Sequence, residues 1–100
     1  MNDYAELLES ISALASALQG LQAVAVAEYR PAVETLIATG SRDTQQIERT
    51  LDGLLDFCGD ERALELYRRL CRHYFDIDPV TTASYINAYR EWWDSDEVQE

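Results

Sequence analysis

Residues 10–27 read SISALASALQGLQAVAVA, an uncharged stretch that decides how the rest of the chain is interpreted. In and around it, apolar residues recur at alternating intervals of four and three: Leu7, Ile11, Leu14, Leu18, Leu21 and Ala25. This spacing is the a/d seam of a heptad repeat, which marks a helix that packs against another helix and rules out a strand. A second row, Ser12, Ser16 and Gly20, holds small residues that allow another helix to approach closely.

The absence of charge between Glu9 and Glu28 indicates that this first helix is covered on more than one side. Two arrangements satisfy the pattern: the central helix of a bundle, or a helix that pairs with a second copy of the chain. We expect the first, with the seam docking the apolar stripes of the later helices. It follows that Leu18→Asp, which puts a charge into the seam, should abolish folding.

The same stretch does not predict a membrane span. Six of its residues are polar or glycine, and its flanks are acidic, whereas a span requires about 20 strongly apolar residues. The acidic start, MNDYAELLE, is also unlike the basic start of a signal peptide. We therefore expect a cytoplasmic protein without membrane contact.

Downstream, helix signals recur at short intervals. Pro31 either kinks the first helix or starts a new one over 31–39, which Gly40 closes. Further helices are predicted at 44–58 after an Asp43 cap, at 61–75 after an Asp60 cap, and from Asp78-Pro79 onward. The predicted fold is all-α: a compact bundle of four to five helices with a long N-terminal helix, kinked or broken at Pro31. Residues 1–94 form one domain, and 95–100 form an acidic tail that should fray.

Charge is the strongest compositional feature. Nineteen acids face eight bases, all of them arginine, for a net charge of −11. Such a protein is repelled by nucleic acid and by anionic membranes, so we expect no direct nucleic-acid contact. It is attracted to basic surfaces, including those that normally bind nucleic acid.

Two sets of residues are candidates for binding a partner. Glu48, Asp52 and Asp56 recur every four residues on one helix face, where carboxylates either stay solvated or imitate a phosphate strand. Tyr89, Trp92 and Trp93 belong to an aromatic-rich region between residues 67 and 93. These aromatics either pack between the last two helices or anchor a partner, as Tyr and Trp commonly do at interfaces.

Basic residues gather on one side of helix 61–75, opposite its apolar side: Arg62, Arg68, Arg69, Arg72 and His73. Glu65 is spaced to pair with Arg68 and Arg69, which favours a solvated or paired face over an acidic protein partner or nucleic acid. The helix-turn-helix alternative is weak, because the last helix offers Arg90 alone to read bases.

Catalytic chemistry is not indicated. His73 is the only histidine, and Cys71 lies two residues away, where helix side chains do not face each other. Zinc requires about four ligands with recognisable spacing, which two cysteines and one histidine do not supply. The sequence also has no glycine-rich phosphate loop. Cys58 and Cys71 fall on apolar helix faces and are expected to be buried free thiols. We predict no enzyme activity, no catalytic residues, no metal and no cofactor.

Residues 51–97 contain three short runs, LDGLLDFC, YRRLC and DPVTTASYINAYREW. In these runs the chain resembles small uncharacterised acidic helical proteins carried by bacterial mobile elements. The resemblance assigns no site residues, but it implies a protein that inhibits host defence or a nucleic-acid enzyme.

The leading functional hypothesis is accordingly a non-enzymatic protein-binding module that inhibits a basic, nucleic-acid-handling protein through Glu48, Asp52, Asp56 and the C-terminal aromatics. The alternative is a self-associating accessory protein that uses the seam as a homo-oligomer contact, and a nucleic-acid binder ranks last.

Overall fold

The computed structural model describes residues 3–94, which form four helices and no strand. They are α1 (Asp3–Ala38), α2 (Thr44–Leu55), α3 (Glu61–Phe75) and α4 (Pro79–Trp93). The all-α prediction is confirmed, with the long N-terminal helix and the lower of the two expected helix counts. The predicted tail at 95–100 lies outside the described residues.

The helix boundaries follow the local chemistry of the sequence. Asp43 and Asp60 cap α2 and α3: their carboxylates accept from the backbone N–H of Gln46, and of Arg62 and Ala63. Asp78 caps α4 in the same way, and Pro79 opens that helix. Gly40 adopts φ 62°, the left-handed conformation that ends α1. The second helix is shorter than predicted: it ends at Leu55, and three-residue turns carry the chain through Phe57 and Cys58.

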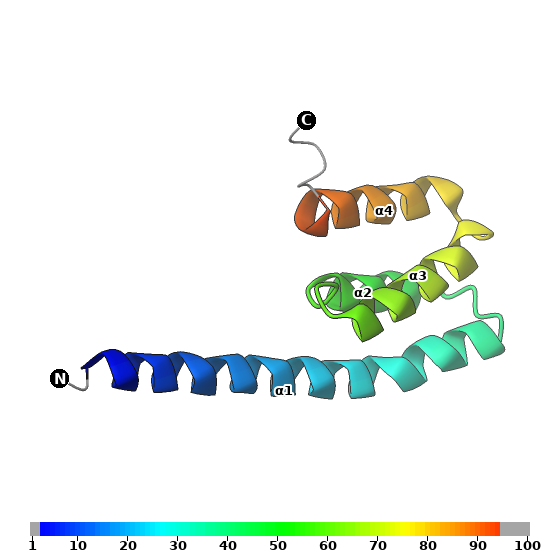
Figure 1. Ribbon diagram of the computed structural model, residues 1–100. Helices are drawn as coiled ribbons and strands as arrows, with labels where there is room; N and C mark the ends of the chain where they lie inside the picture. The colour runs from blue at the N-terminus through cyan, green and yellow to red at the C-terminus, as the bar shows by residue number, and fades with distance from the viewer. Residues whose placement is uncertain (1–2, 95–100) are drawn as a thin grey trace.

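Pro31 lies inside α1 and does not end the helix. Proline removes the N–H that would bond to the carbonyl of Ala27, but both residues are exposed, so water can reach that carbonyl. Figure 1 shows the part of α1 after this point turning out of line with the straight N-terminal part. The segment predicted over 31–39 is therefore the end of α1 rather than a separate helix.

Helices α2 and α3 form the middle of the bundle, with the C-terminal part of α1 on one side and α4 on the other (Figure 1). Helix α3 contacts all three of the others. The largest fully buried side chains lie where these helices meet: Val33, Ile47, Leu51, Leu54, Leu66, Leu70, Tyr74 and Thr82. On α1 only Ala25, Val26, Val33 and Leu36 are buried.

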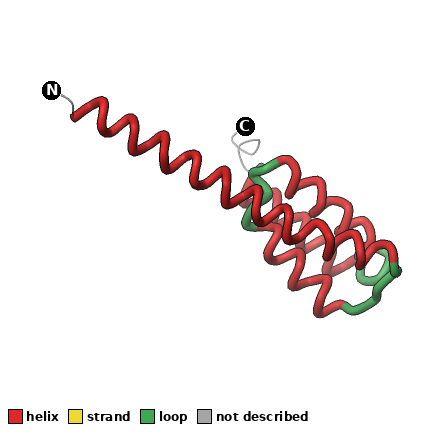
Figure 2. The backbone as a smooth tube through the Cα atoms, turned by 90° about the horizontal axis from the view of Figure 1, so that it is seen from below, coloured by secondary structure: helices red, strands yellow, loops and turns green. Residues whose placement is uncertain are grey.

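The N-terminal part of α1 leaves the bundle, and none of residues 3–24 is buried. Figure 2 shows it projecting as a single rod, and the molecule measures 60 × 37 × 17 Å. We call residues 3–24 the arm. The expectation that this segment is the spine of the bundle is wrong: Leu18 is 54% exposed and Leu14 is 62% exposed. The periodicity identified the apolar face correctly, but none of residues 3–94 covers that face along the arm.

Candidate functional site

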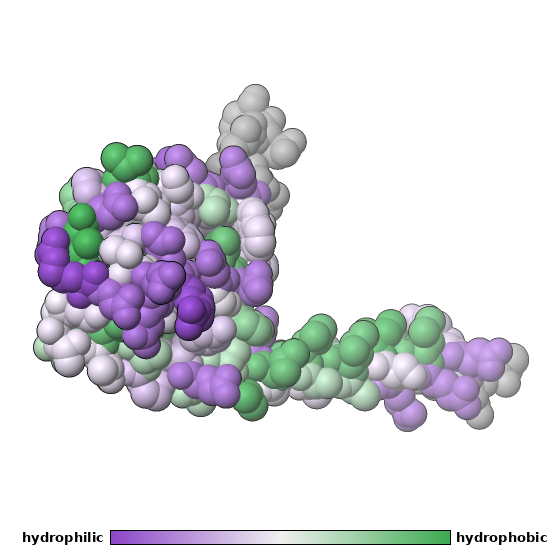
Figure 3. All heavy atoms as spheres, turned by 180° about the vertical axis from the view of Figure 1, so that it is seen from behind, coloured by the Kyte–Doolittle hydropathy of each residue, from purple (hydrophilic) through white to green (hydrophobic). Residues whose placement is uncertain are grey.

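The arm presents the largest run of bare apolar side chains in the described structure. Its exposed large residues are Tyr4, Leu7, Leu8, Ile11, Leu14, Leu18, Leu21 and Val24. Figure 3 shows a nearly continuous strip of hydrophobic residues along the arm, which reaches the bundle. Single exposed leucines are ordinary, but a contiguous exposed apolar strip marks a contact site for another protein or for a membrane.

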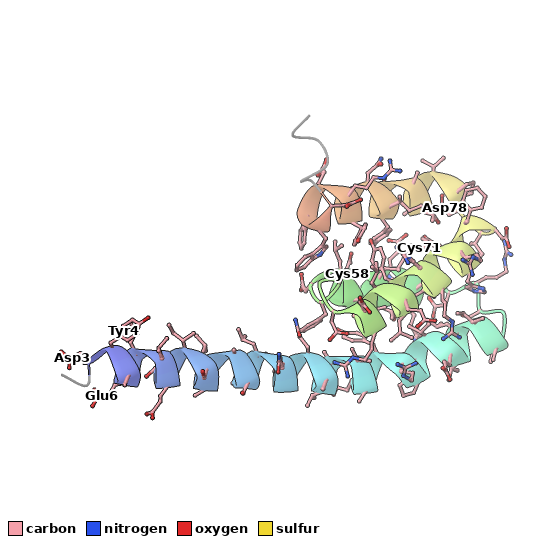
Figure 4. The ribbon with its side chains drawn as sticks, viewed as in Figure 1. Asp3, Tyr4, Glu6, Cys58, Cys71 and Asp78 are labelled. Atoms are coloured by element: carbon pink, nitrogen blue, oxygen red, sulfur yellow. The ribbon has the colours of Figure 1, made fainter. Side chains whose placement is uncertain are left out.

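The acids on the arm are concentrated at its far end. Figure 4 places Asp3, Tyr4 and Glu6 at the end of α1 farthest from the bundle. Glu9 is the last charged residue before Glu28. The strip therefore offers apolar contact over most of its length and negative charge at one end only.

The predicted acidic stripe is largely occupied by contacts inside the bundle. The hydroxyl of Tyr74 donates to the carboxylate of Glu48, and that of Tyr85 donates to Asp52 at 2.9 Å. Burial, followed by the bond to Asp52, raises the pKa of Tyr85. Among residues 3–94, Asp56 is the one member of the stripe whose side chain makes no hydrogen bond, and the other two bond to tyrosines of α3 and α4.

The three predicted aromatic anchors have different environments. Tyr89 is half-buried and packs near Tyr67, with ring centroids 6.4 Å apart. The indole Nε1 of Trp93 donates to the backbone oxygen of Leu55 at 2.9 Å, and its ring lies over Gly59. Trp92 is 57% exposed. Tyr89 thus packs within the bundle, whereas Trp93 is 43% exposed despite its bond to Leu55, and Trp92 is the more exposed of the two tryptophans.

The basic face of α3 is divided among several contacts. Arg62 pairs with the Asp60 cap at 2.8 Å, and this contact lowers the pKa of Asp60 to about 2. Arg69 reaches Glu34 of α1 at 3.6 Å, and His73 Nε2 lies 2.8 Å from the backbone oxygen of Ser41. The pairing of Glu65 with Arg68 and Arg69 is not recorded among residues 3–94. Sequence reasoning missed Glu34 and Ser41 because both belong to a different element.

A groove of about 570 Å³ runs between α3 and α4. Its apolar lining includes Leu64, Cys71, Phe75 and Ile86, and three arginines line it as well: Arg68, Arg72 and Arg90. Asp76 and Asp94 are its acidic lining residues. The lining of the groove thus combines apolar side chains with charged groups of both signs.

The thiols are buried as predicted. Cys58 and Cys71 are free cysteines in the interior, on the loop after α2 and on α3 (Figure 4). Burial is the main cause that raises the pKa of Cys58 to about 12 and that of Cys71 to about 11. Both are therefore protonated at neutral pH. Among residues 3–94, no group of three His, Cys, Asp or Glu side chains is placed to hold a metal ion.

By length and composition alone, α1 is one helix that could cross a membrane, with a mean hydropathy of 1.4 over its most apolar window. Only 11% of that window is buried in the structure. The comparisons with known proteins add no relative: no family model, no curated protein and no solved structure matches the chain.

Proposed function

We propose that the protein is a non-enzymatic, self-associating helical protein whose arm pairs with the arm of a second copy. The observation that carries this proposal is the exposed seam from Tyr4 to Leu21, which has heptad spacing and no cover within the described chain. Leu and Ile at both seam positions are the residues that mediate helix pairing in coiled coils. Burying a half-exposed Leu contributes roughly 1–2 kcal/mol, so six seam positions per copy offer a substantial driving force.

A helical partner suits the arm better than lipid does. A helix surrounded by lipid is apolar on all sides. The arm is apolar on the seam, whereas its opposite side carries Glu9, Ser12, Ser16 and Gly20. That two-sided character is typical of a helix whose one face is covered by another helix and whose other face meets water.

Sedimentation velocity across a wide concentration range tests the proposal. We expect the wild-type chain to associate reversibly and Leu14→Asp to remain monomeric, because the charge lies inside the paired seam. Val80→Asp is the matched control, since Val80 is a 78% exposed apolar residue on α4, away from the arm. A wild-type chain that stays monomeric at every concentration, without detergent or lipid, would exclude self-association.

A second candidate function is the inhibition of a basic, nucleic-acid-handling or host-defence protein. The observation in its favour is a small surface where the ends of α2 and α4 meet: Trp93 bonds to Leu55, so exposed Asp56 and exposed Trp92 belong to the same end of the bundle. Carboxylate and indole together suit a cationic partner. Capture of host proteins by the wild-type chain but not by a Trp92→Ala/Asp56→Asn variant would support this function, and equal capture by both would exclude this surface.

A further inference from the structure

The direction in which the arm's apolar face points can be read from α1 itself. Eighteen residues make five full turns of an α-helix, so residues 18 apart point the same way. Ala25, Val26 and Leu36 follow Leu7, Leu8 and Leu18 at that interval, and all three are buried. The arm therefore exposes the same face of α1 that its C-terminal part uses to pack on α2 and α3.

This shared face determines which way a second copy can run. In a parallel pair, the partner's α1 would continue along the seam past Ala25 and meet α2 and α3, which already cover that face. In an antiparallel pair, the partner's helix runs the other way. Its bundle-bearing part then extends beyond the far end of the arm, where Figures 1 and 2 show free space.

The seam spacing also selects a register. Antiparallel coiled coils set a positions of one helix against d positions of the other. If Tyr4 faces Leu21 of the other copy, then Leu7 faces Leu18 and Ile11 faces Leu14, so all six exposed seam side chains find a counterpart. A shift of one heptad toward the bundle would place Tyr4 opposite Glu28, and a shift away from the bundle would leave Leu18 and Leu21 uncovered.

Charge favours the same arrangement. The arm holds Asp3, Glu6 and Glu9 and no base. A parallel pair would bring the two acidic ends together, whereas an antiparallel pair keeps them at opposite ends, at the heights of Gln22, Gln19 and Ser16 of the other copy.

We infer that two copies pair their arms antiparallel over residues 4–21, with a twofold axis between residues 12 and 13 and one bundle at each end. This inference rests on the proposed self-association and adds its partner surface, direction and register. The interface is isologous, so it closes on itself and produces a dimer rather than a filament.

Cysteine cross-linking of the full-length chain tests direction and register. Leu7→Cys and Leu18→Cys are oxidised mildly, each alone and as an equimolar mixture, and covalent dimer is measured on a non-reducing gel. In the inferred dimer, Leu7 of one copy faces Leu18 of the other, whereas the two copies of residue 7 lie roughly 16 Å apart along the axis. A disulfide requires Cα atoms within about 7 Å. We expect several-fold more covalent dimer in the mixture than in either variant alone.

The matched control is the pair Glu9→Cys and Ser16→Cys, which lies at corresponding heights but on the face opposite the seam. This mixture should cross-link no more than wild type, whose own thiols are buried. Leu7→Cys cross-linking alone would overturn the antiparallel direction. A wild-type dimer in sedimentation with no cross-link in the seam mixture would overturn the register and leave self-association standing, whereas a strictly monomeric chain would refute the proposed function itself.

Discussion

At the residue scale, two tyrosine hydroxyls connect α3 and α4 to the acids of α2. Tyr74 is fully buried and donates to Glu48, which is half-buried. Tyr74→Phe removes the donor and leaves that carboxylate with one partner fewer, so we expect a loss of about 1–2 kcal/mol in the free energy of unfolding. Urea denaturation measures it. Tyr4→Phe is the control, because Tyr4 is exposed on the arm and should leave the bundle's stability unchanged.

The buried thiols predict a pH dependence of stability. The pKa of Cys58 is raised to about 12 and that of Cys71 to about 11, whereas both titrate near 9 in the unfolded chain. Above pH 9 the unfolded state therefore releases protons that the folded state keeps, and stability falls as the pH rises further. Below that pH both states hold the protons and these groups contribute no slope.

A thiol-reactive dye distinguishes this account from an exposed-thiol alternative. We expect slow labelling of the folded chain at pH 8 and rapid labelling in denaturant. Rapid labelling of both cysteines under native conditions would show that Cys58 and Cys71 are accessible to solvent and not buried.

At the element scale, two helical glycines should respond to alanine with opposite signs. Alanine in place of a helical glycine stabilises the helix by roughly 0.5–1 kcal/mol if the methyl group has room. At Gly20 nothing lies within 4 Å of the added Cβ, whereas at Gly53 the Cβ would lie 2.0 Å from the hydroxyl of Tyr29. We expect Gly20→Ala to raise helicity and Gly53→Ala to lower the melting temperature, both followed by circular dichroism. A stabilising Gly53→Ala would show that Tyr29 moves aside without loss.

The seam gives the second prediction at this scale, and it reverses the one drawn from the sequence. Because Leu18 is 54% exposed, Leu18→Asp should leave the bundle folded and its melting temperature within a few degrees of that of Leu14→Asp, a second monomeric variant. Leu51→Asp, at a fully buried position of α2, should abolish the cooperative transition. If Leu18→Asp fails to fold at concentrations where Leu14→Asp is folded, Leu18 must be buried in the core and not exposed on the arm.

The features that could be predicted from the sequence depend on local contacts, and those that could not depend on contacts between distant residues. The caps at Asp43, Asp60 and Asp78 were predictable because a capping residue and the amides it binds lie within three residues. The contacts of Glu48 and Asp52 were not, because their partners Tyr74 and Tyr85 are 26 and 33 residues away. The seam shows the same limit: heptad spacing identifies an apolar face but does not say whether the covering helix belongs to the same chain.

At the scale of the whole molecule, the charge of −11 bears on both candidate functions in opposite directions. Two copies of the chain repel each other, while the seam that joins them is uncharged. Added salt screens that repulsion and does not weaken apolar burial, so self-association should strengthen as the salt concentration rises. Sulfate should strengthen it further than chloride, because it favours the burial of apolar surface.

A complex with a basic partner should respond in the other way. The attraction between Asp56, the other surface carboxylates and a cationic protein is screened by the same ions, so binding weakens as salt rises. Sedimentation of the chain alone and binding to any captured protein, both followed through one salt series, therefore separate the two functions. Self-association that weakens steadily with salt would contradict the apolar seam as its cause, because it would mean that charged contacts hold the copies together.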